Sequence, residues 1–344
     1  MSQQPLILRA AFKQPVERTP VWVMRQAGRY LPEYRATRAK AGNFLNLCKT
    51  PELAAEVTIQ PLDLIGVDAV ILFSDILTPL EGMGIELDFT PAPIIHNPLR
   101  TAADIERLKT PDPDENVPYV GKILDLLTQE LQGRAPIIGF CGAPFTLACY
   151  AIEGGGSKLF AKTKALFFDQ PKLAHALMAK LTCMTIDYLN YQIAHGAQMV
   201  QMFDTWAGIL CPDDYREFCL PYVKQVFAGL HRQGEVARVY YINGGHQHLT
   251  DMAASGAEVV GLDWMCDLGQ VKAQIGQQVA LQGNLDPNVL FASPEVIRAK
   301  VKAILDKQGK DPGHIFNLGH GIDKDVNPDH LRAMVAAVKE LSAR

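Results

Sequence analysis

The sequence predicts a single-domain (β/α)8 barrel, and three observations support that fold class. Eight short apolar runs alternate with helical patterns along the 344 residues. Each run is apolar on both faces, as expected of a parallel strand that is covered on both sides. No linker or low-complexity segment interrupts the pattern. Residues 1–344 are therefore expected to form one domain, longer than the roughly 250 residues typical of this fold.

The predicted strands are brief runs that are rich in β-branched and aromatic residues. They cover residues 20–24, 68–73, 135–140, 198–203, 238–242, 258–263, 278–283 and 314–319. An open doubly wound sheet is the alternative architecture. It usually has fewer strands and a glycine-rich first turn, and this sequence shows neither feature.

A helical pattern follows each predicted strand. One helix is expected to open at Thr50-Pro51-Glu52, where a threonine cap precedes proline in the first turn. The other helices are expected at residues 114–132, 170–195, 212–233, 246–255, 268–275, 293–308 and 328–341. This alternation of strand and helix is the pattern of a barrel with an outer ring of helices.

Composition excludes several classes of partner. The net charge is −4, so no overall basic field would attract nucleic acid or an anionic membrane. No apolar run approaches the roughly 18 residues of a membrane span, and the N-terminus lacks the apolar core of a signal peptide. The seven cysteines are scattered and form no C-x-x-C pair, so we expect buried thiols in a reducing, cytoplasmic compartment.

In a barrel, functional groups gather where the strands end. The polar side chains at the predicted strand ends are Arg25, Arg29, Asp75, Tyr150, Asp204, Thr205, Asn243, Asp263, Asn284, Asp286 and His320. Asp286 is expected to be a helix N-cap, because aspartate often precedes a helix. Arginine, histidine and tyrosine are not caps, so their convergence at one mouth indicates a binding site.

Arg25 and Arg29 suggest the charge of the ligand. Many basic residues between positions 9 and 40 are explained by a solvated surface, but these two directly follow a predicted core strand. A guanidinium group binds carboxylate or phosphate through two parallel hydrogen bonds. The ligand is therefore expected to be an anion.

Other site types lack their sequence signatures. "EGGGSK" at residues 153–158 does not have the order of a phosphate-binding P-loop, and no G-x-G-x-x-G follows a strand. No G-x-S-x-G elbow indicates a serine nucleophile. His246 and His248 are two residues apart, which does not place them on one helix face, so we expect two exposed histidines and no metal site.

Two long motifs resemble the signatures of the uroporphyrinogen decarboxylase family. They are "PVWVMRQAGRYLPEYR" (20–35) and "GFCGAPFTLACYAIEGGGS" (139–157). Shorter segments fit the same family in order: "FSDIL" (73–77), "FDTWAG" (203–208), "YINGG" (241–245), "QGNLDP" (282–287) and "NLGHGI" (317–322). The resemblance implies a cytoplasmic homodimer of barrel domains, a carboxy-lyase without metal or organic cofactor. Its substrate would be uroporphyrinogen III, whose four acetate groups become methyl groups in tetrapyrrole synthesis.

The resemblance also implies which residues form the site. By motif position, the substrate-binding residues are Arg25, Gln26, Ala27, Gly28, Arg29, Asp75, Tyr150, Thr205 and His320, and the catalytic residues are Asp75 and Arg25. Arg38 matches a further family arginine. Zinc-dependent corrinoid methyltransferases share the fold but carry H-x-C where this chain reads Tyr241-Ile242-Asn243. A non-catalytic tetrapyrrole carrier is the other alternative.

Asp75 suits the chemistry that the family implies. Protonation of the pyrrole ring creates a cation that accepts the electrons released with carbon dioxide, and a fixed carboxylate stabilises that cation. The alternative for Asp75 is a helix cap or a structural ion pair. Arg25 could hold a carboxylate or deliver the proton, but a guanidinium is a poor acid at neutral pH. A bound water or a carboxylic acid of the substrate is the alternative proton donor.

Overall fold

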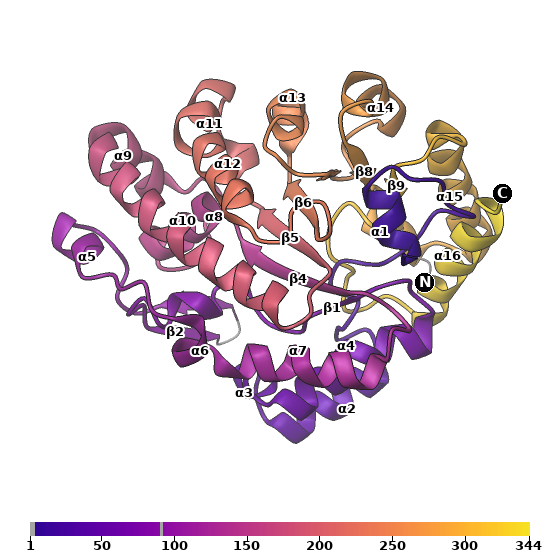
Figure 1. Ribbon diagram of the computed structural model, residues 1–344, viewed down its shortest axis with the longest axis horizontal. Coiled ribbons are helices and arrows are strands. Elements are labelled where there is room, and N and C mark those ends of the chain that lie inside the picture. The colour runs from indigo at the N-terminus through magenta and orange to yellow at the C-terminus, as the bar shows by residue number, and fades with distance from the viewer. Residues whose placement is uncertain (1–3, 90–91) are drawn as a thin grey trace.

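The computed structural model describes residues 4–89 and 92–344 and contains a curled parallel sheet of seven strands with helices outside it (Figure 1). The strands are β1 (Val70–Ile71), β4 (Ile137–Gly142), β5 (Met199–Asp204), β6 (Ala237–Ile242), β7 (Val259–Gly261), β8 (Ala280–Gln282) and β9 (His314–Ile315). Their order in the sheet follows their order in the chain. The predicted parallel α/β sheet with strand–helix alternation is confirmed.

The strand predicted at residues 20–24 is wrong as a strand. Val21 makes only an isolated parallel bridge to Phe316, although the segment bonds both edges of the sheet. On one side the Phe316 N–H donates to Pro20 O (2.8 Å), and on the other the Asp68 N–H donates to Val21 O (2.8 Å). The Val21 N–H donates to the Asp68 side chain instead of a neighbouring strand (2.8 Å). Pro20 has no N–H, so a regular ladder cannot extend through it.

The helices that cover the sheet correspond to the predicted ones, with three differences. They are α4 (Pro51–Ile65), α7 (Pro118–Leu131), α10 (Pro171–Ala194), α12 (Leu220–Gly229), α13 (Leu249–Ala253), α14 (Leu268–Ile275), α15 (Pro294–Gln308) and α16 (Pro328–Leu341). The helix predicted at 114–132 splits into α6 (Pro113–Asn116) and α7, because Pro118 cannot continue the backbone ladder. The one predicted at 212–233 splits into α11 (Pro212–Phe218) and α12, with Pro221 in the first turn of α12.

The third difference is at residues 246–255, where the chain begins as the 3₁₀ turn η3 (Gly245–His248) before α13. The expected cap at Asp286 is confirmed: it caps the 3₁₀ helix η4 (Pro287–Phe291) by accepting from the Asn288 N–H. Helix α4 begins at Pro51 as expected, but the prediction of a threonine cap is wrong, because the Thr50 hydroxyl donates to Asn46 O (2.7 Å) and makes no cap bond.

Two separate apolar clusters form the core. One lies between the sheet and its helices, and the other fills the inside of the curled sheet. The inner cluster joins the helix α1 (Leu6–Ala11) to strand residues such as Met199 and Ala280. A buried chain of hydrogen bonds also crosses the inside, from Trp22 Nε1 to Gln282 Oε1 and from Gln282 Nε2 to Gln201 Oε1, each 2.9 Å. The inside of the sheet is therefore packed and not an open channel.

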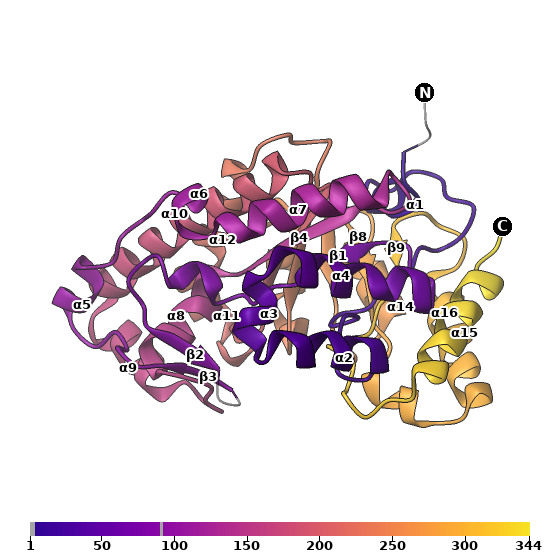
Figure 2. The same ribbon diagram turned by 90° about the horizontal axis from the view of Figure 1, so that it is seen from below.

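The remaining elements are short helices, turns and a hairpin that connect the strands and helices named above (Figure 2). They are α2 (Pro32–Ala41), α3 (Phe44–Lys49), η1 (Thr78–Leu80), the antiparallel hairpin β2 (Leu87–Phe89) and β3 (Pro93–Ile95), α5 (Ala102–Glu106), α8 (Pro144–Glu153), α9 (Ala161–Asp169) and η2 (Ala207–Ile209). Aromatic rings tie some of these loops together: Phe44 contacts both Phe73 (5.8 Å) and Phe89 (5.2 Å). These loops carry the candidate site.

The cysteines are less uniformly buried than predicted. Cys48, Cys141, Cys149 and Cys219 are buried and Cys266 is partly buried. The prediction is wrong for Cys183 and Cys211, which are exposed.

Within residues 4–89 and 92–344, no helix is long and apolar enough to cross a membrane.

Buried His314 predicts that stability falls in acid. Its Nε2–H donates to Gly283 O (2.8 Å), Nδ1 has no partner, and burial lowers the pKa of the imidazole to about 4. The unfolded chain binds this proton near pH 6.5, so acid favours unfolding. The free energy of unfolding should fall by up to about 3 kcal/mol between pH 6.5 and pH 4 through this group. Urea titrations at several pH values measure it, and His314→Gln should reduce the slope. An unchanged slope in that variant would contradict the assignment.

Candidate active site

The turn that carries the two arginines is pinned by a buried glutamine. Gln26 is 0 % exposed, and its side-chain amide bonds the backbone on both sides. Gln26 Oε1 accepts from the Val23 N–H (3.0 Å), and Nε2 donates to Ala69 O at the start of the sheet (3.0 Å). Tyr30 donates its hydroxyl proton to Gln26 O (2.8 Å). The polar groups of the Gln26 side chain are thus used inside the protein, and they fix the position of Arg25.

Ala27 and Gly28 continue this turn. A Cβ on Gly28 would lie 2.8 Å from Arg25 O, so this close approach requires glycine. The N–H groups of Ala27, Gly28 and Arg29 donate to no described residue. Successive free N–H groups in a turn attract anions.

Arg25 and Arg29 are exposed, and their guanidinium groups bond no described residue. Other arginines of the basic N-terminal stretch do have partners. Arg18 pairs with Asp68 at 2.6 Å, and Arg35 donates to Arg29 O at 2.7 Å. Arg25 and Arg29 thus differ from Arg18 and Arg35 in having no internal partner for the guanidinium group.

Asp75 lies in the loop after β1 and has one occupied oxygen. Oδ1 accepts from the Leu77 N–H (2.9 Å), and Oδ2 has no partner among the described residues. Asp75 therefore caps the turn before η1 as well as offering a free oxygen. Although the side chain keeps some accessible surface, burial of the carboxyl raises its pKa to about 6. The Leu77 N–H and the positive charge of Arg25 act in the opposite direction.

His320 is a neutral hydrogen-bond donor. The Gly321 N–H donates to His320 Nδ1 (2.8 Å), so the ring proton of the neutral imidazole lies on Nε2. Burial lowers the pKa of His320 to about 4, and Arg25 lowers it further while Asp263 opposes the shift. The ring lies edge-on to those of Tyr241 (6.5 Å) and Trp264 (6.2 Å).

Tyr150 and Thr205 come from neighbouring positions of the sheet. Tyr150 lies on α8, and its ring packs against that of Trp206 at 6.1 Å. Burial raises the pKa of its hydroxyl, and the charges of both Asp75 and Arg25 act on it. Thr205 directly follows β5, is partly buried, and its hydroxyl bonds no described residue.

Arg25 is the residue that connects the site. Its charge acts on the pKa values of Asp75, Tyr150, Tyr241 and His320, so each of these side chains lies within electrostatic reach of Arg25. No comparable interaction joins Arg29 or Thr205 to this group within the described residues.

Arg38, the further arginine that the family resemblance indicates, places its guanidinium carbon 5.5 Å from the centre of the Phe44 ring.

Sequence reasoning missed three residues that shape this mouth. Tyr241 donates its hydroxyl to Gly319 O (2.8 Å), and Asp263 accepts from the Met265 N–H (2.8 Å) and from the Gly244 N–H. Gly321 lies against the Arg25 side chain, where an added Cβ would be 2.3 Å from Cδ. Asp263 was visible as a polar strand end, whereas the roles of Tyr241 and Gly321 depend on contacts that the sequence does not show.

The prediction of two exposed histidines is wrong for His248. His246 is exposed, but His248 is buried and stacks on the Tyr215 ring at 4.2 Å, because η3 turns it toward α11. In the part of the chain that the structure describes, no group of three or more histidine, cysteine, aspartate or glutamate side chains could hold a metal ion.

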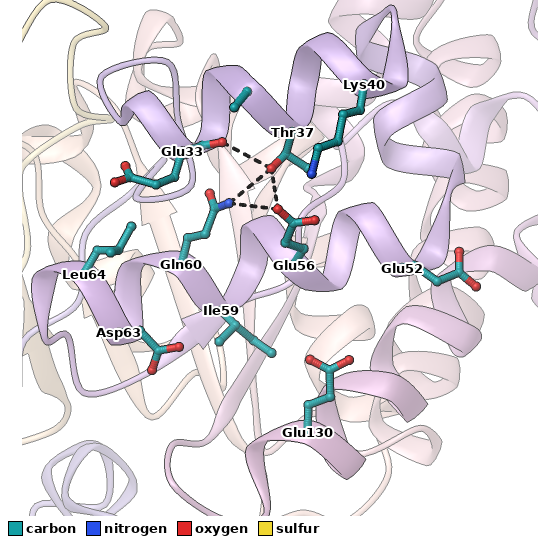
Figure 3. A pocket seen from close by; sticks show the side chains of 11 residues that line it. Glu33, Thr37, Lys40, Glu52, Glu56, Ile59, Gln60, Asp63, Leu64 and Glu130 are labelled. Carbon is teal, nitrogen blue, oxygen red and sulfur yellow. Dashed lines mark hydrogen bonds between the residues drawn. The ribbon is translucent and has the colours of Figure 1, made fainter.

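A groove of about 670 Å³ lies outside the mouth, between α2 and α4 (Figure 3). Its charged lining consists of Glu33, Lys40, Glu52, Glu56, Asp63 and Glu130. Glu56 accepts from the Thr37 hydroxyl at 2.6 Å. Five carboxylates against one ammonium group would repel an anionic ligand, so the groove does not suit the anion that the arginines predict.

The fold and the mouth define a class of protein: a parallel α/β protein with two arginines without internal partners, Arg25 and Arg29, in the turn that follows the first predicted strand. A family model described as "Uroporphyrinogen decarboxylase (URO-D)" matches residues 2–341. The chain belongs to the uroporphyrinogen decarboxylase family.

Curated relatives agree over almost the full length. The chain is 53 % identical over 337 residues to uroporphyrinogen decarboxylase of Geobacter metallireducens, with 98 % of each chain covered. It is also 53 % identical over 343 residues to uroporphyrinogen decarboxylase of Azotobacter vinelandii, covering 98 % of this chain and 97 % of the relative. A solved methyltransferase from Methanosarcina mazei has the same fold, with a TM-score of 0.83, 97 % coverage of both chains and 22 % identity.

The contact between Gly321 and Arg25 predicts a matched pair of variants. Gly321→Ala should displace the Arg25 side chain, raise KM for substrate and lower kcat/KM about 10- to 100-fold, with little change in Tm. Gly319→Ala should instead lower Tm, because its Cβ would lie 2.2 Å from the backbone nitrogen of Trp264. Steady-state kinetics and thermal unfolding separate the two effects. An unchanged KM in Gly321→Ala would show that Arg25 does not hold the substrate.

Proposed function

We propose that this mouth carries out the reaction of the family, the removal of carbon dioxide from the four acetate groups of uroporphyrinogen III to give coproporphyrinogen III. Family membership over residues 2–341 supports the reaction. The observation that supports the site is Arg25, a guanidinium without an internal partner whose charge reaches Asp75 and His320. The chain is accordingly a carboxy-lyase of tetrapyrrole biosynthesis.

In the proposed site, Arg25 and Arg29 clamp the carboxylates of the substrate. Both are exposed, and neither bonds a described residue, so binding sacrifices no internal ion pair. The free N–H groups of Ala27 and Gly28 add hydrogen-bond donors to the clamp. Holding the reacting acetate in a fixed orientation lowers the entropic part of the barrier.

Asp75 stabilises the cation that forms when the pyrrole ring is protonated. With a pKa of about 6, the carboxyl is mostly ionised at pH 7, and Oδ2 is free to accept from a pyrrole N–H. The acetate carboxylate then leaves as carbon dioxide, and its bonding electrons neutralise the ring. A proton adds to the exocyclic carbon to give the methyl group, and the ring proton is released, so each step consumes one proton overall.

Three neutral donors complete the binding of the other carboxylates. His320 donates through Nε2, and Tyr150 and Thr205 donate through their hydroxyls. His320 stays neutral at pH 7 because burial and Arg25 both disfavour its protonation. The proton for the ring comes from Arg25, a bound water or a carboxylic acid of the substrate, and the carboxylic acid is the strongest acid of the three, since a guanidinium has a pKa above about 12.

The proposal extends to the complete fold. The segment at residues 20–24 makes backbone hydrogen bonds next to β9 on one side and next to β1 on the other. These bonds support an eighth position in the sheet, which would close it into a single-domain barrel.

The family resemblance also implies that the chain is a homodimer that binds uroporphyrinogen in the cytoplasm. Analytical ultracentrifugation of the purified chain tests the dimer.

The function is tested by incubating the chain with uroporphyrinogen III under reducing conditions and counting the carboxylates left on the product. Asp75→Asn keeps the shape but removes the charge, so it should fold normally and lose at least about 100-fold in kcat. Circular dichroism and Tm serve as controls. Binding without decarboxylation by the unaltered chain would support a carrier instead, and full turnover by Asp75→Asn would remove Asp75 from the mechanism.

Arg29→Ala tests the clamp separately from the chemistry. Loss of one charge-assisted contact should raise KM about tenfold and change kcat much less. Arg35→Ala is the matched control, because the Arg35 guanidinium bonds the carbonyl of Arg29 rather than a ligand. Equal KM values for Arg29→Ala and the unaltered chain would contradict a carboxylate contact at Arg29.

A further inference from the structure

Asp204 is a buried carboxyl that the proposed mechanism does not use. It is the last residue of β5 and is 0 % exposed. Within the described part of the chain, no basic side chain pairs with it, and burial raises its pKa to about 6. A buried carboxyl without a counter-ion is costly unless hydrogen bonds compensate for the lost water.

Two hydroxyl groups supply that compensation. Thr146 donates to Asp204 Oδ1 (2.8 Å), and Tyr240 donates to Oδ2 (2.9 Å). Tyr215 in turn donates to the Tyr240 hydroxyl (3.2 Å). The carboxyl therefore joins β5 to α8, β6 and α11.

The Thr146 hydroxyl makes a second hydrogen bond, to the backbone of Trp206. It accepts from the Trp206 N–H (3.2 Å) while it donates to Asp204. Thr205 lies between these two residues in the chain, so both of its neighbours are bonded to one side-chain oxygen. The Thr146 hydroxyl thus holds the Asp204 side chain on one side of Thr205 and the Trp206 backbone N–H on the other.

Thr146 also lies on α8, the helix that carries Tyr150. Thr146 is in the first turn of α8, and Tyr150 follows four residues later on the same helix face. The Thr146 backbone N–H also acts on the Asp204 carboxyl, which places a negative group at the N-terminus of α8, where the helix dipole favours it. The Trp206 ring packs on Tyr150 (6.1 Å) and on Phe160 (4.7 Å).

From this geometry we infer that Asp204 and Thr146 are positioning residues. They fix the positions of the Thr205 and Tyr150 hydroxyls so that both can bind the substrate carboxylates. This role rests on the proposed contacts of Thr205 and Tyr150 with substrate. Neither positioning residue touches the substrate itself. The Ala143 N–H also donates to Phe203 O (2.8 Å) and ties the start of α8 to β5, but this backbone bond does not fix the direction of the Thr205 or Tyr150 hydroxyl.

The test compares two substitutions at one position. Thr146→Val keeps the branched shape and removes the hydroxyl, whereas Thr146→Ser keeps the hydroxyl. Thr146→Val should lower kcat/KM about tenfold, and Thr146→Ser should stay within about twofold of the unaltered chain. The product mixture of Thr146→Val should contain more porphyrinogens that have lost only some of their acetate carboxyls. Equal kcat/KM for the two variants would overturn the inference.

A second background separates positioning from general stability. In a chain that carries both Tyr150→Phe and Thr205→Ala, adding Thr146→Val should cost less than about twofold in kcat/KM, because its targets are gone. A full tenfold loss in that background would overturn the inference. If Tyr150→Phe and Thr205→Ala leave kcat/KM unchanged, the proposed substrate contacts fail, and the positioning role fails with them.

Tyr240→Phe keeps the inference testable if Thr146→Val does not fold. It removes the other hydrogen bond to Asp204 and should lower kcat/KM several-fold. Tyr215→Phe is the matched control, because it removes only the outer bond to Tyr240 and should change kcat/KM less than twofold. Equal effects of the two phenylalanine variants would contradict the role of the carboxyl.

Discussion

The side-chain amide of Gln26 bonds Val23 and Ala69, and the geometry of the mouth depends on this pair of buried hydrogen bonds. They hold the turn at which Arg25 adopts a φ of 62°, a left-handed conformation that costs roughly 1 to 2 kcal/mol for a residue with a Cβ. A buried amide with both ends satisfied is rigid, because breaking either bond leaves an unpaired polar group. The turn therefore presents Arg25 in a fixed place without using its guanidinium.

Burial and the charge of Arg25 together determine the protonation of Asp75 and His320. The positive charge favours the ionised form of Asp75 and the neutral form of His320, so it lowers the pKa values of both. Burial acts in opposite senses on these two groups, raising the pKa of the carboxyl and lowering that of the imidazole. The result at neutral pH is a carboxylate at Asp75 and a neutral donor at His320, both within reach of the charge of Arg25. This combination suits a substrate that carries many carboxylates and becomes a cation during the reaction.

Much of the fold was predictable from local signals. Seven of the eight predicted strands overlap observed strands, because continuous apolar runs mark parallel strands that are covered on both faces. The failure at residues 20–24 has a physical cause: Pro20 lacks an N–H, and the Asp68 side chain takes the N–H of Val21. The helices at 114–132 and 212–233 broke near Pro118 and Pro221, prolines that the apolar periodicity alone did not reveal as breaks.

The sequence by itself determined the strand–helix alternation, the polar strand ends and the family, since these follow from residue type, spacing and motif. It therefore indicated Arg25, Asp75, Tyr150 and His320 as candidates. Only the tertiary structure decided which arginines lack partners, which tautomer His320 adopts, and that Thr146 links Asp204 to Trp206. The reason is physical: the two bonds of Thr146 span 58 and 60 positions of the chain, and local patterns carry no information on such contacts or on the burial that shifts a pKa.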